Sequence, residues 1–449
     1  MTKGKKDKNR VAIATLGCKV NQCESASFHE NFAEQGYTIT PFSQAADIYV
    51  INTCAVTAKA AAQSRQLIRK AHRTNPDAKL VVTGCYAQVD PQKVREILDD
   101  SVCIVGNANK HELLDAALHE TSSCQKCKEK EEPHYFNEIA TQKHISHLPY
   151  KGFAERTRAF LKIQDGCNNF CSYCIVPYAR GRSRSLDPGE VLRQAALFAD
   201  QGYKEIVLTG IHVGHYGLDL ETGVNLFQIL EQLTKQNPTV RFRLSSLEPT
   251  EISLELLQFM AATDNFMPHL HIPLQSGDDT ILKKMKRRYS VADFAGIVHK
   301  CKELLPTAAI GVDVLTGFPG EDEQAFQNTV ALLKALPVTY LHVFPYSKRP
   351  STPAADFSDQ VPEKIKEQRV AVLRKLDHKK RIDFYCSHLG EVHRVLTETI
   401  KDKEGMANGF TENYIPVEFN ARPKNTNQVV LVKLDGIADK KVRGSIVAR

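Results

Sequence analysis

The sequence has no tryptophan, only five methionines among 449 residues, and no long apolar run. No stretch approaches the roughly 20 apolar residues of a membrane-spanning helix, so we expect no membrane partner. The basic first ten residues are followed by no apolar segment of signal-peptide length, and we therefore expect a cytoplasmic protein. Hydrophobic residues at 42% and charged residues at 25% exclude wholesale disorder. The formal net charge of +7 permits a polyanionic partner without requiring one.

The first part of the chain, residues 9–121, alternates short apolar runs with helical patterns. The predicted strands are Val11–Leu16, Asp47–Asn52 and Lys79–Thr83, and the predicted helices between them are Ser25–Gln35 and Ala58–Thr74. This alternation is typical of an α/β domain with a parallel sheet. The strands are continuous apolar runs, which indicates that both faces of the sheet are covered.

Three further segments follow. Residues 122–152 are polar and charged and are predicted to form a linker. Over residues 153–383 we expect strands at Ala159–Ile163, Glu205–Thr209, Arg241–Ser245, His269–Pro273, Gly311–Thr316 and Leu341–Pro345. Six βα units predict a doubly wound sheet or a partial (β/α)6 barrel, whose site lies at the C-terminal ends of the strands. Residues 386–449 contain short strands separated by turn residues, which favours a small antiparallel β-barrel.

Twelve cysteines are the most informative feature of the composition. In a reducing compartment they favour metal binding or catalysis over disulfides. Cys167, Cys171 and Cys174 form a C-x3-C-x2-C loop directly after the first strand of the second domain. A four-iron cluster held by three thiolates keeps one iron open to a small molecule. A structural zinc ion would need a fourth ligand, and no histidine or cysteine follows Cys174 closely.

The spacing of this loop, with the aromatic Tyr173 before its last cysteine, resembles the signature of the radical S-adenosylmethionine (SAM) enzymes. The resemblance implies a [4Fe-4S] cluster that binds SAM and, once reduced by a donor such as flavodoxin or ferredoxin, cleaves it to a 5′-deoxyadenosyl radical. It also implies SAM contacts at the strand ends. The candidates, besides Tyr173, are Thr209, Gly210, Ser246, Glu248, Gly317 and Gly320. A turn-forming role is the alternative for the two last glycines.

A second set of cysteines, Cys18, Cys54 and Cys85, follows the three predicted strands of the first domain. Their spacings of 36 and 31 residues each correspond to about one βα repeat. Parallel strands place all three at one edge of the sheet, where α/β proteins bind ligands. Three thiolates again suggest a cluster with one open iron. The alternative is three unrelated core cysteines.

Two such triads on these two domains resemble the radical SAM methylthiotransferase family. The resemblance covers nearly the whole chain and is carried by TLGCKVNQCE, VINTCAVT, VTGCYAQ, GCNNFCSYCIVPYARGRSRS, LTGIHVG, HIPLQSG, GFPGE and HVFPYSK. It implies two [4Fe-4S] clusters, two SAM molecules, and a C-terminal barrel similar to the TRAM RNA-binding module. The wording LGCKVN and the pair Asn168-Asn169 resemble the branch that methylthiolates C2 of N6-threonylcarbamoyladenosine at tRNA position 37.

Three alternatives to this function stay open on the sequence. Within the family, the substrate can be isopentenyladenosine tRNA or a ribosomal protein. Outside it, the chain can be a non-catalytic nucleic-acid-binding protein that uses metal as a structural staple. The C-x-x-C pair Cys124 and Cys127 falls outside the six-cysteine set and is either idle or a zinc site. The expected partner of a monomeric enzyme is the tRNA anticodon stem-loop.

Two basic runs are candidates for phosphate contact, with a solvated surface as the alternative. Their members are Arg180, Arg182 and Arg184 in the first, and Lys286, Arg287 and Arg288 in the second. Arg243 carries a separate hypothesis. Strand alternation points it into the barrel, where it either binds the substrate carboxylate or pairs with an acid such as Asp313.

Overall fold

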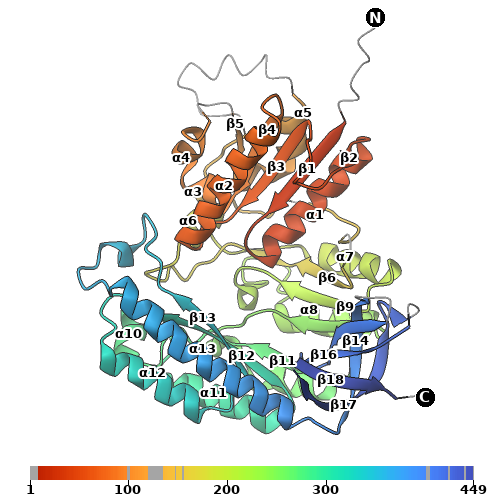
Figure 1. The fold of residues 1–449 in the computed structure, drawn as a ribbon, viewed down its shortest axis with the longest axis vertical. Coiled ribbons are helices and arrows are strands. Elements are labelled where there is room, and N and C mark those ends of the chain that lie inside the picture. Colours follow the sequence, from red (N-terminus) through yellow and green to blue (C-terminus); the bar gives the residue numbers. More distant parts are fainter. Residues whose placement is uncertain are drawn as a thin grey trace, which may run out of the picture.

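The computed structural model describes residues 9–98, 102–119, 135–146, 148–153, 156–400, 405–422, 425–438 and 441–447. The N-terminal unit is a five-stranded parallel sheet in the order β2-β1-β3-β4-β5 (Figure 1). Its strands are β1 (Arg10–Thr15), β2 (Thr38–Ile39), β3 (Ile48–Thr53), β4 (Lys79–Gly84) and β5 (Val102–Val105). The parallel α/β arrangement predicted from the sequence is confirmed. The short strands β2 and β5 extend it beyond the three predicted strands.

Helices cover both faces of this sheet. Phe28 and Phe32 of α1 (Lys19–Glu34) pack with α5 (Leu113–Leu118) against one face. Ile68 of α2 (Ala58–Thr74) packs with α3 (Cys85–Val89) and α4 (Pro91–Arg95) against the other. The Thr57 hydroxyl caps α2 by accepting a hydrogen bond from the Ala60 N–H. The apolar strands are thus shielded on both sides, as their composition requires.

Six parallel strands form the central partial barrel. They are β6 (Arg158–Lys162), β9 (Glu205–Thr209), β10 (Arg241–Leu244), β11 (His269–His271), β12 (Ala309–Thr316) and β13 (Tyr340–Pro345). The halves β10-β9-β6 and β11-β12-β13 meet where the Leu247 N–H donates to the His271 carbonyl, at 3.0 Å. The outer helices are α7 (Pro188–Asp200), α8 (Leu226–Gln236), α9 (Leu254–Ala262), α10 (Asp279–Lys284), α11 (Val291–Leu304) and α12 (Glu323–Ala335). Phe242 and Leu244 join the apolar layer under these helices. Arg243 points the other way, as predicted.

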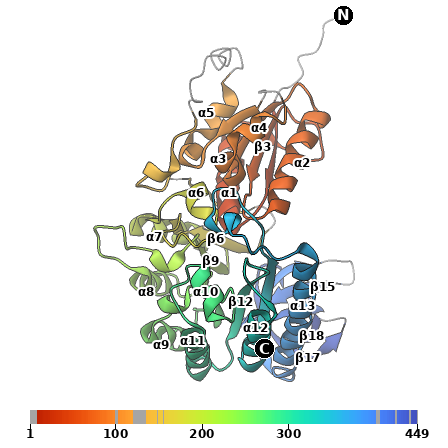
Figure 2. The ribbon, with the colours of Figure 1, turned by 90° about the vertical axis from the view of Figure 1, so that its left-hand side faces the viewer.

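Two features connect the barrel to its neighbours. The pair β7 (Gln164–Asp165) and β8 (Arg184–Ser185) flanks α6 (Val176–Arg180), which lies at the junction with the N-terminal unit (Figures 1 and 2). The segment predicted as a polar linker is partly packed. In the portion that the structure describes, Ile139 of a short 3-10 helix (Ile139–Thr141) and Tyr150 are buried, and the Tyr150 hydroxyl donates to the Phe160 carbonyl at 2.7 Å. Both residues lie in a segment that is mostly polar, and for this reason the segment was predicted to be a linker.

The long helix α13 (Glu363–Cys386) leads to a closed C-terminal barrel in the order β14-β15-β16-β18-β17. Its strands are β14 (Val392–Ile400), β15 (Met406–Phe410), β16 (Pro416–Asn420), β17 (Val429–Ala438) and β18 (Lys441–Ile446). The small barrel predicted from the sequence is confirmed, although β16 and β18 pair in parallel. Strands β14, β16 and β17 overlap strands predicted at His393–Ile400, Tyr414–Phe419 and Gln428–Lys433. Strands β15 and β18 were not predicted, because Asn408, Gly409 and Gly444 interrupt their apolar pattern. Across the described ranges, no helix is long and apolar enough to cross a membrane.

Candidate functional site

The three N-terminal cysteines come together at the C-terminal edge of the sheet. Cys18 precedes α1, Cys54 follows β3, and Cys85 begins α3. Gly17 before the first has a φ of +95°, and a Cβ built there would lie 2.9 Å from the Cys54 sulfur. Glycine thus allows the first loop to approach the second. The predicted convergence of the triad is therefore seen in the fold.

The electrostatics of this triad suit a bound metal. Burial raises the pKa of Cys54 to about 11, and the thiols of Cys85 and Cys18 add to the effect. Burial also raises the pKa of Cys85, while Arg180 opposes it. Three neighbouring thiolates repel one another unless a cation binds between them, and a metal deprotonates coordinating thiols. The donor set fits an iron–sulfur cluster, and the role of the three thiols as ligands stays a prediction.

A buried charge network joins the two cysteine-bearing units. The Arg180 guanidinium of α6 donates to Glu24 of α1 at 3.0 Å and to Asp165 of β7 at 2.9 Å. Lys162 binds Asp165 at 2.9 Å, and Lys110 pairs with Glu24. Burial alone would raise the pKa of Glu24, but Arg180, Lys110 and Lys162 hold it well below its usual range. The network fixes α6, and with it the barrel cysteine loop, against α1.

The barrel triad lies at the strand ends on one loop. The Cys171 sulfur accepts a hydrogen bond from Arg287 at 3.3 Å. The Cys167 sulfur lies 3.5 Å from Nδ1 of His212. Burial raises the pKa of Cys174 to about 12, with Cys171 and Cys167 as further causes. This donor set also fits an iron–sulfur cluster, since three converging thiols are flanked by two groups that can stabilise negative sulfur.

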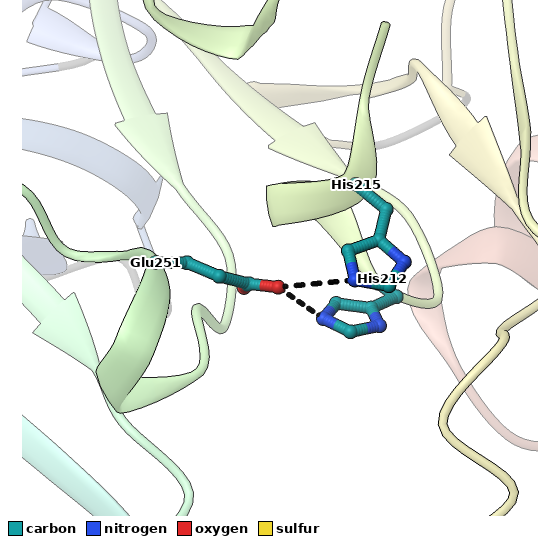
Figure 3. Close-up of side chains that lie close together, drawn as sticks. All are labelled: His212, His215 and Glu251. Atoms are coloured by element: carbon teal, nitrogen blue, oxygen red, sulfur yellow. Dashed lines mark hydrogen bonds and ion pairs between the residues drawn. The ribbon is translucent and has the colours of Figure 1, made fainter. Parts of the chain in front are cut away.

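His212 approaches Cys167 of this triad and belongs to a group of side chains with His215 and Glu251, which Figure 3 shows. Its Nε2 binds the Glu251 carboxylate, and the His215 ring stacks on its own ring with centroids 3.7 Å apart. Burial lowers the pKa of His212, but hydrogen bonds to Cys167 and Glu251 outweigh burial and raise it to about 10. His212 is thus held as a donor toward Cys167. The three side chains also have the composition of a metal site.

The SAM candidates lie around the barrel triad, and their contact with SAM stays a prediction. Thr209 is buried at the end of β9, and the Glu248 carboxylate binds Arg287. Ser246 hydrogen-bonds to Nδ1 of His271. The Tyr173 ring packs on Phe318, with centroids 6.3 Å apart.

The three candidate glycines are explained by packing within the protein. A Cβ on Gly210 would lie 2.9 Å from Oε1 of Gln164. Gly317 and Gly320 have φ values of +74° and +82°, and the space of their missing Cβ atoms faces Lys366 in the first case and Lys284 in the second. The turn-forming alternative accounts for Gly317 and Gly320, because positive φ favours glycine there.

The two basic runs divide into buried and exposed members. Arg180 and Arg184 are buried, and Arg287 binds Glu248 and Cys171. These three do not fit the expected phosphate contact, because their guanidinium groups already donate to protein groups. Arg182, Lys286 and Arg288 are exposed and stay candidates for RNA contact.

Arg243 is committed to the protein interior. Its Nε donates to Glu205 at 3.0 Å, and its Nη1 donates to the carbonyl of Glu412 in the C-terminal barrel at 3.1 Å. The predicted alternative of pairing with a barrel acid is confirmed, but the acid is Glu205 and not Asp313, because His271 and His342 lie against the Asp313 carboxylate at 3.1 and 3.3 Å. Arg243 thus holds the central barrel to the C-terminal barrel, and a role in binding the substrate carboxylate does not fit.

Sequence reasoning missed His212, Glu251, Glu24 and Asp165. His212 stands within the LTGIHVG motif, three residues after the end of β9, and this position could have identified it. Glu24 and Asp165 carry no local signal, because their partner Arg180 is distant along the chain. The pair Cys124 and Cys127 lies outside the described residues.

Comparisons with known proteins agree with this arrangement. Residues 10–106 match the uncharacterized protein family UPF0004, and residues 161–333 match the radical SAM superfamily. The threonylcarbamoyladenosine tRNA methylthiotransferase MtaB of Bacillus subtilis is 41% identical over 94% of this chain and 93% of its own length. The MtaB of Aquifex aeolicus is 40% identical over 91% and 96%.

More distant relatives define the wider group. A tRNA-2-methylthio-N(6)-dimethylallyladenosine synthase of Pelotomaculum thermopropionicum is 33% identical over 95% of both chains. The fold resembles that of the radical SAM methyltransferase TsrM from Kitasatospora setae, with a TM-score of 0.56, 14% identity, and coverage of 88% of this chain and 79% of that one. The chain belongs to the radical SAM methylthiotransferase family.

Proposed function

We propose that this protein is a tRNA methylthiotransferase that modifies C2 of N6-threonylcarbamoyladenosine at position 37. The observation that carries the proposal is the pair of thiol triads, one on each unit, held together by the buried network around Arg180. The 41% identity to a relative with this activity over most of both chains supports the choice of substrate.

Each triad is proposed to hold one [4Fe-4S] cluster. The ligands are Cys167, Cys171 and Cys174 in the barrel, and Cys18, Cys54 and Cys85 in the N-terminal unit. When bound, the clusters and two SAM molecules supply a radical that can attack the inert C2–H bond and a methylated sulfur that replaces the hydrogen. Arg287 and His212 donate to the sulfurs of the barrel triad and stabilise their negative charge.

The remaining parts of the chain are assigned to binding. We propose that residues 9–121 carry the sulfur-presenting site, that 153–383 carry the SAM site, and that the TRAM-like barrel of 386–449 binds the anticodon stem-loop. Arg182, Lys286 and Arg288 are exposed and suit phosphate contact. Base 37 must be unstacked for an enzyme to reach its C2 atom. A monomeric cytoplasmic enzyme reduced by flavodoxin or ferredoxin completes the proposal.

Reconstitution tests this function directly. Anaerobic loading with iron and sulfide should give about eight irons per chain, as two four-iron clusters require. With reductant and SAM, tRNA containing N6-threonylcarbamoyladenosine should acquire a methylthio group, measured by mass spectrometry of nucleosides. A zinc-only preparation would favour the metal-stapled binding protein. Product on dimethylallyladenosine tRNA or on a ribosomal protein, in place of this substrate, would assign the chain to another branch.

A further inference from the structure

Lys19 stands at the boundary between the N-terminal triad and the barrel interior. It is the first residue of α1 and directly follows Cys18. Its ammonium group lies 5.7 Å from the centroid of the Phe160 ring on β6. It is also near enough to Glu205 and Arg243 to interact with both electrostatically. The side chain therefore extends from the sulfur-presenting unit toward the inner face of the barrel.

The other cations near Lys19 have anionic or carbonyl partners. Arg158 binds Glu398 of the C-terminal barrel at 2.7 Å. Arg243 pairs with Glu205, whose two carboxylate oxygens both accept hydrogen bonds from its guanidinium. Among the described residues, Lys19 has no hydrogen bond or ion pair, and its ammonium group lies over the Phe160 ring.

Lys19 is half-buried, and an ammonium group that leaves water without an anionic partner is energetically costly. The nearest carboxylate, Glu205, is fully buried and is already paired with Arg243. Moving it to Lys19 would leave the guanidinium of Arg243 uncompensated. Lys19 therefore presents a half-buried ammonium group without a protein anion, which a carboxylate of a ligand would neutralise.

We propose that Lys19 binds the carboxylate of the threonylcarbamoyl group of the substrate. This inference rests on the proposed function and names the residue that selects the substrate within it. Lys19 adjoins Cys18, so a base bound against this cation lies beside the triad that presents sulfur. The dimethylallyl group of the alternative substrate is a hydrocarbon and gives the ammonium group no partner. Lys19 thus takes the role that the sequence suggested for Arg243.

The test compares two anticodon stem-loops that differ only in charge. One carries N6-threonylcarbamoyladenosine, and the other carries its methyl ester. Binding to the reconstituted enzyme is measured by fluorescence anisotropy. A hydrogen bond to a charged group is worth about 1.5–3 kcal/mol, so wild type should bind the acid roughly 10- to 150-fold more tightly. Lys19→Met should bind both RNAs as weakly as wild type binds the ester.

Two further variants control for folding and for general charge. Lys19→Arg keeps the cation and should retain a preference for the acid. Lys70→Met removes an exposed lysine from α2 and should bind like wild type. Iron content and melting temperature check that Lys19→Met is intact.

Three results would overturn the inference. Equal weakening of acid and ester in Lys19→Met would indicate a phosphate or structural contact. If Lys19→Met keeps the wild-type ratio of acid to ester affinity while wild type still methylthiolates the acid stem-loop, Lys19 does not bind the carboxylate, and the proposed function is unaffected. Methylthiolation of dimethylallyl stem-loops only would instead overturn the proposed function, and the inference with it.

Discussion

The two thiol triads reach similar chemistry by different constructions. Cys167, Cys171 and Cys174 lie within eight consecutive positions on one loop, whereas Cys18, Cys54 and Cys85 follow three neighbouring strands of the sheet, β1, β3 and β4. The first is a local feature that a short peptide can encode. The second exists only when the sheet has formed, because the strands alone bring its members together. The N-terminal triad is therefore expected to depend more strongly on folding.

Their surroundings differ in the same way. The barrel triad receives side-chain donors directly, from Arg287 at 3.3 Å and from His212 at 3.5 Å. The N-terminal triad lies near cations that serve other purposes, since Arg180 belongs to the interface network and Arg349 reaches it from the loop after β13. Hydrogen-bond donors therefore act directly on the sulfurs of the barrel triad. At the N-terminal triad, charged residues near the junction between the units contribute to the electrostatic field.

Removing each triad gives the largest effect and separates the two centres. The first variant has Ala in place of Cys167, Cys171 and Cys174. It should keep about four irons and lose reductive SAM cleavage. The second variant has Ala in place of Cys18, Cys54 and Cys85. It should also keep about four irons and should retain SAM cleavage, but it should form no methylthio product. Iron analysis and product chromatography measure both. Methylthio product from the second variant would show that the N-terminal triad does not present sulfur.

Arg180→Met tests whether the junction couples the centres. The substitution leaves Glu24 and Asp165 buried without their guanidinium partner, which should cost about 3–5 kcal/mol of unfolding free energy. We expect SAM cleavage to continue with a lower yield of methylthio product per SAM cleaved. Denaturant titration and the ratio of the two products measure this. Arg193→Met, an exposed change on α7, is the control. An unchanged product ratio would argue against coupling through this network.

The fold could be read from the sequence wherever apolar runs were continuous. Strand β9 and helix α2 have the predicted bounds, because β9 is buried throughout and α2 buries residues three or four positions apart. Strands β15 and β18 escaped prediction because glycine disturbs their alternation. The convergence of Cys18, Cys54 and Cys85 followed from strand order alone, which is a property of any parallel sheet.

The side-chain partners could not be read in the same way. A run such as RGRSR gives charge but no burial, so buried Arg180 and exposed Arg182 looked alike. Alternation correctly turned Arg243 inward, yet it could not choose between Glu205 and Asp313, which both lie on strands of the barrel. Pairing across distant segments depends on the packed arrangement of the three units.

Arg349→Met should alter the N-terminal centre alone. Burial lowers the pKa of Arg349 while the Cys54 thiol opposes this, which places the cation within electrostatic reach of that triad. Loss of the positive charge should disfavour reduction and lower the midpoint potential of this cluster by roughly 50–100 mV. Redox titration followed by electron paramagnetic resonance measures it, in a protein that lacks the barrel triad. An unchanged midpoint potential of the N-terminal cluster would contradict the assignment.

His212→Gln should give the smallest effect, and on the other centre. His212 is held by Glu251 as a donor to Cys167, so its loss removes one hydrogen bond to sulfur, worth about 1 kcal/mol. Hydrogen bonds to sulfur stabilise the reduced cluster, and the midpoint potential of the barrel cluster should therefore fall by about 40 mV. His215→Gln is a matched control, because His215 stacks on His212 and approaches Glu251 at 3.6 Å from outside the Cys167 contact. The control should leave the potential nearly unchanged. Equal shifts in both variants would mean that the charge of the histidine pair, and not the bond to Cys167, sets the potential of the centre that cleaves SAM.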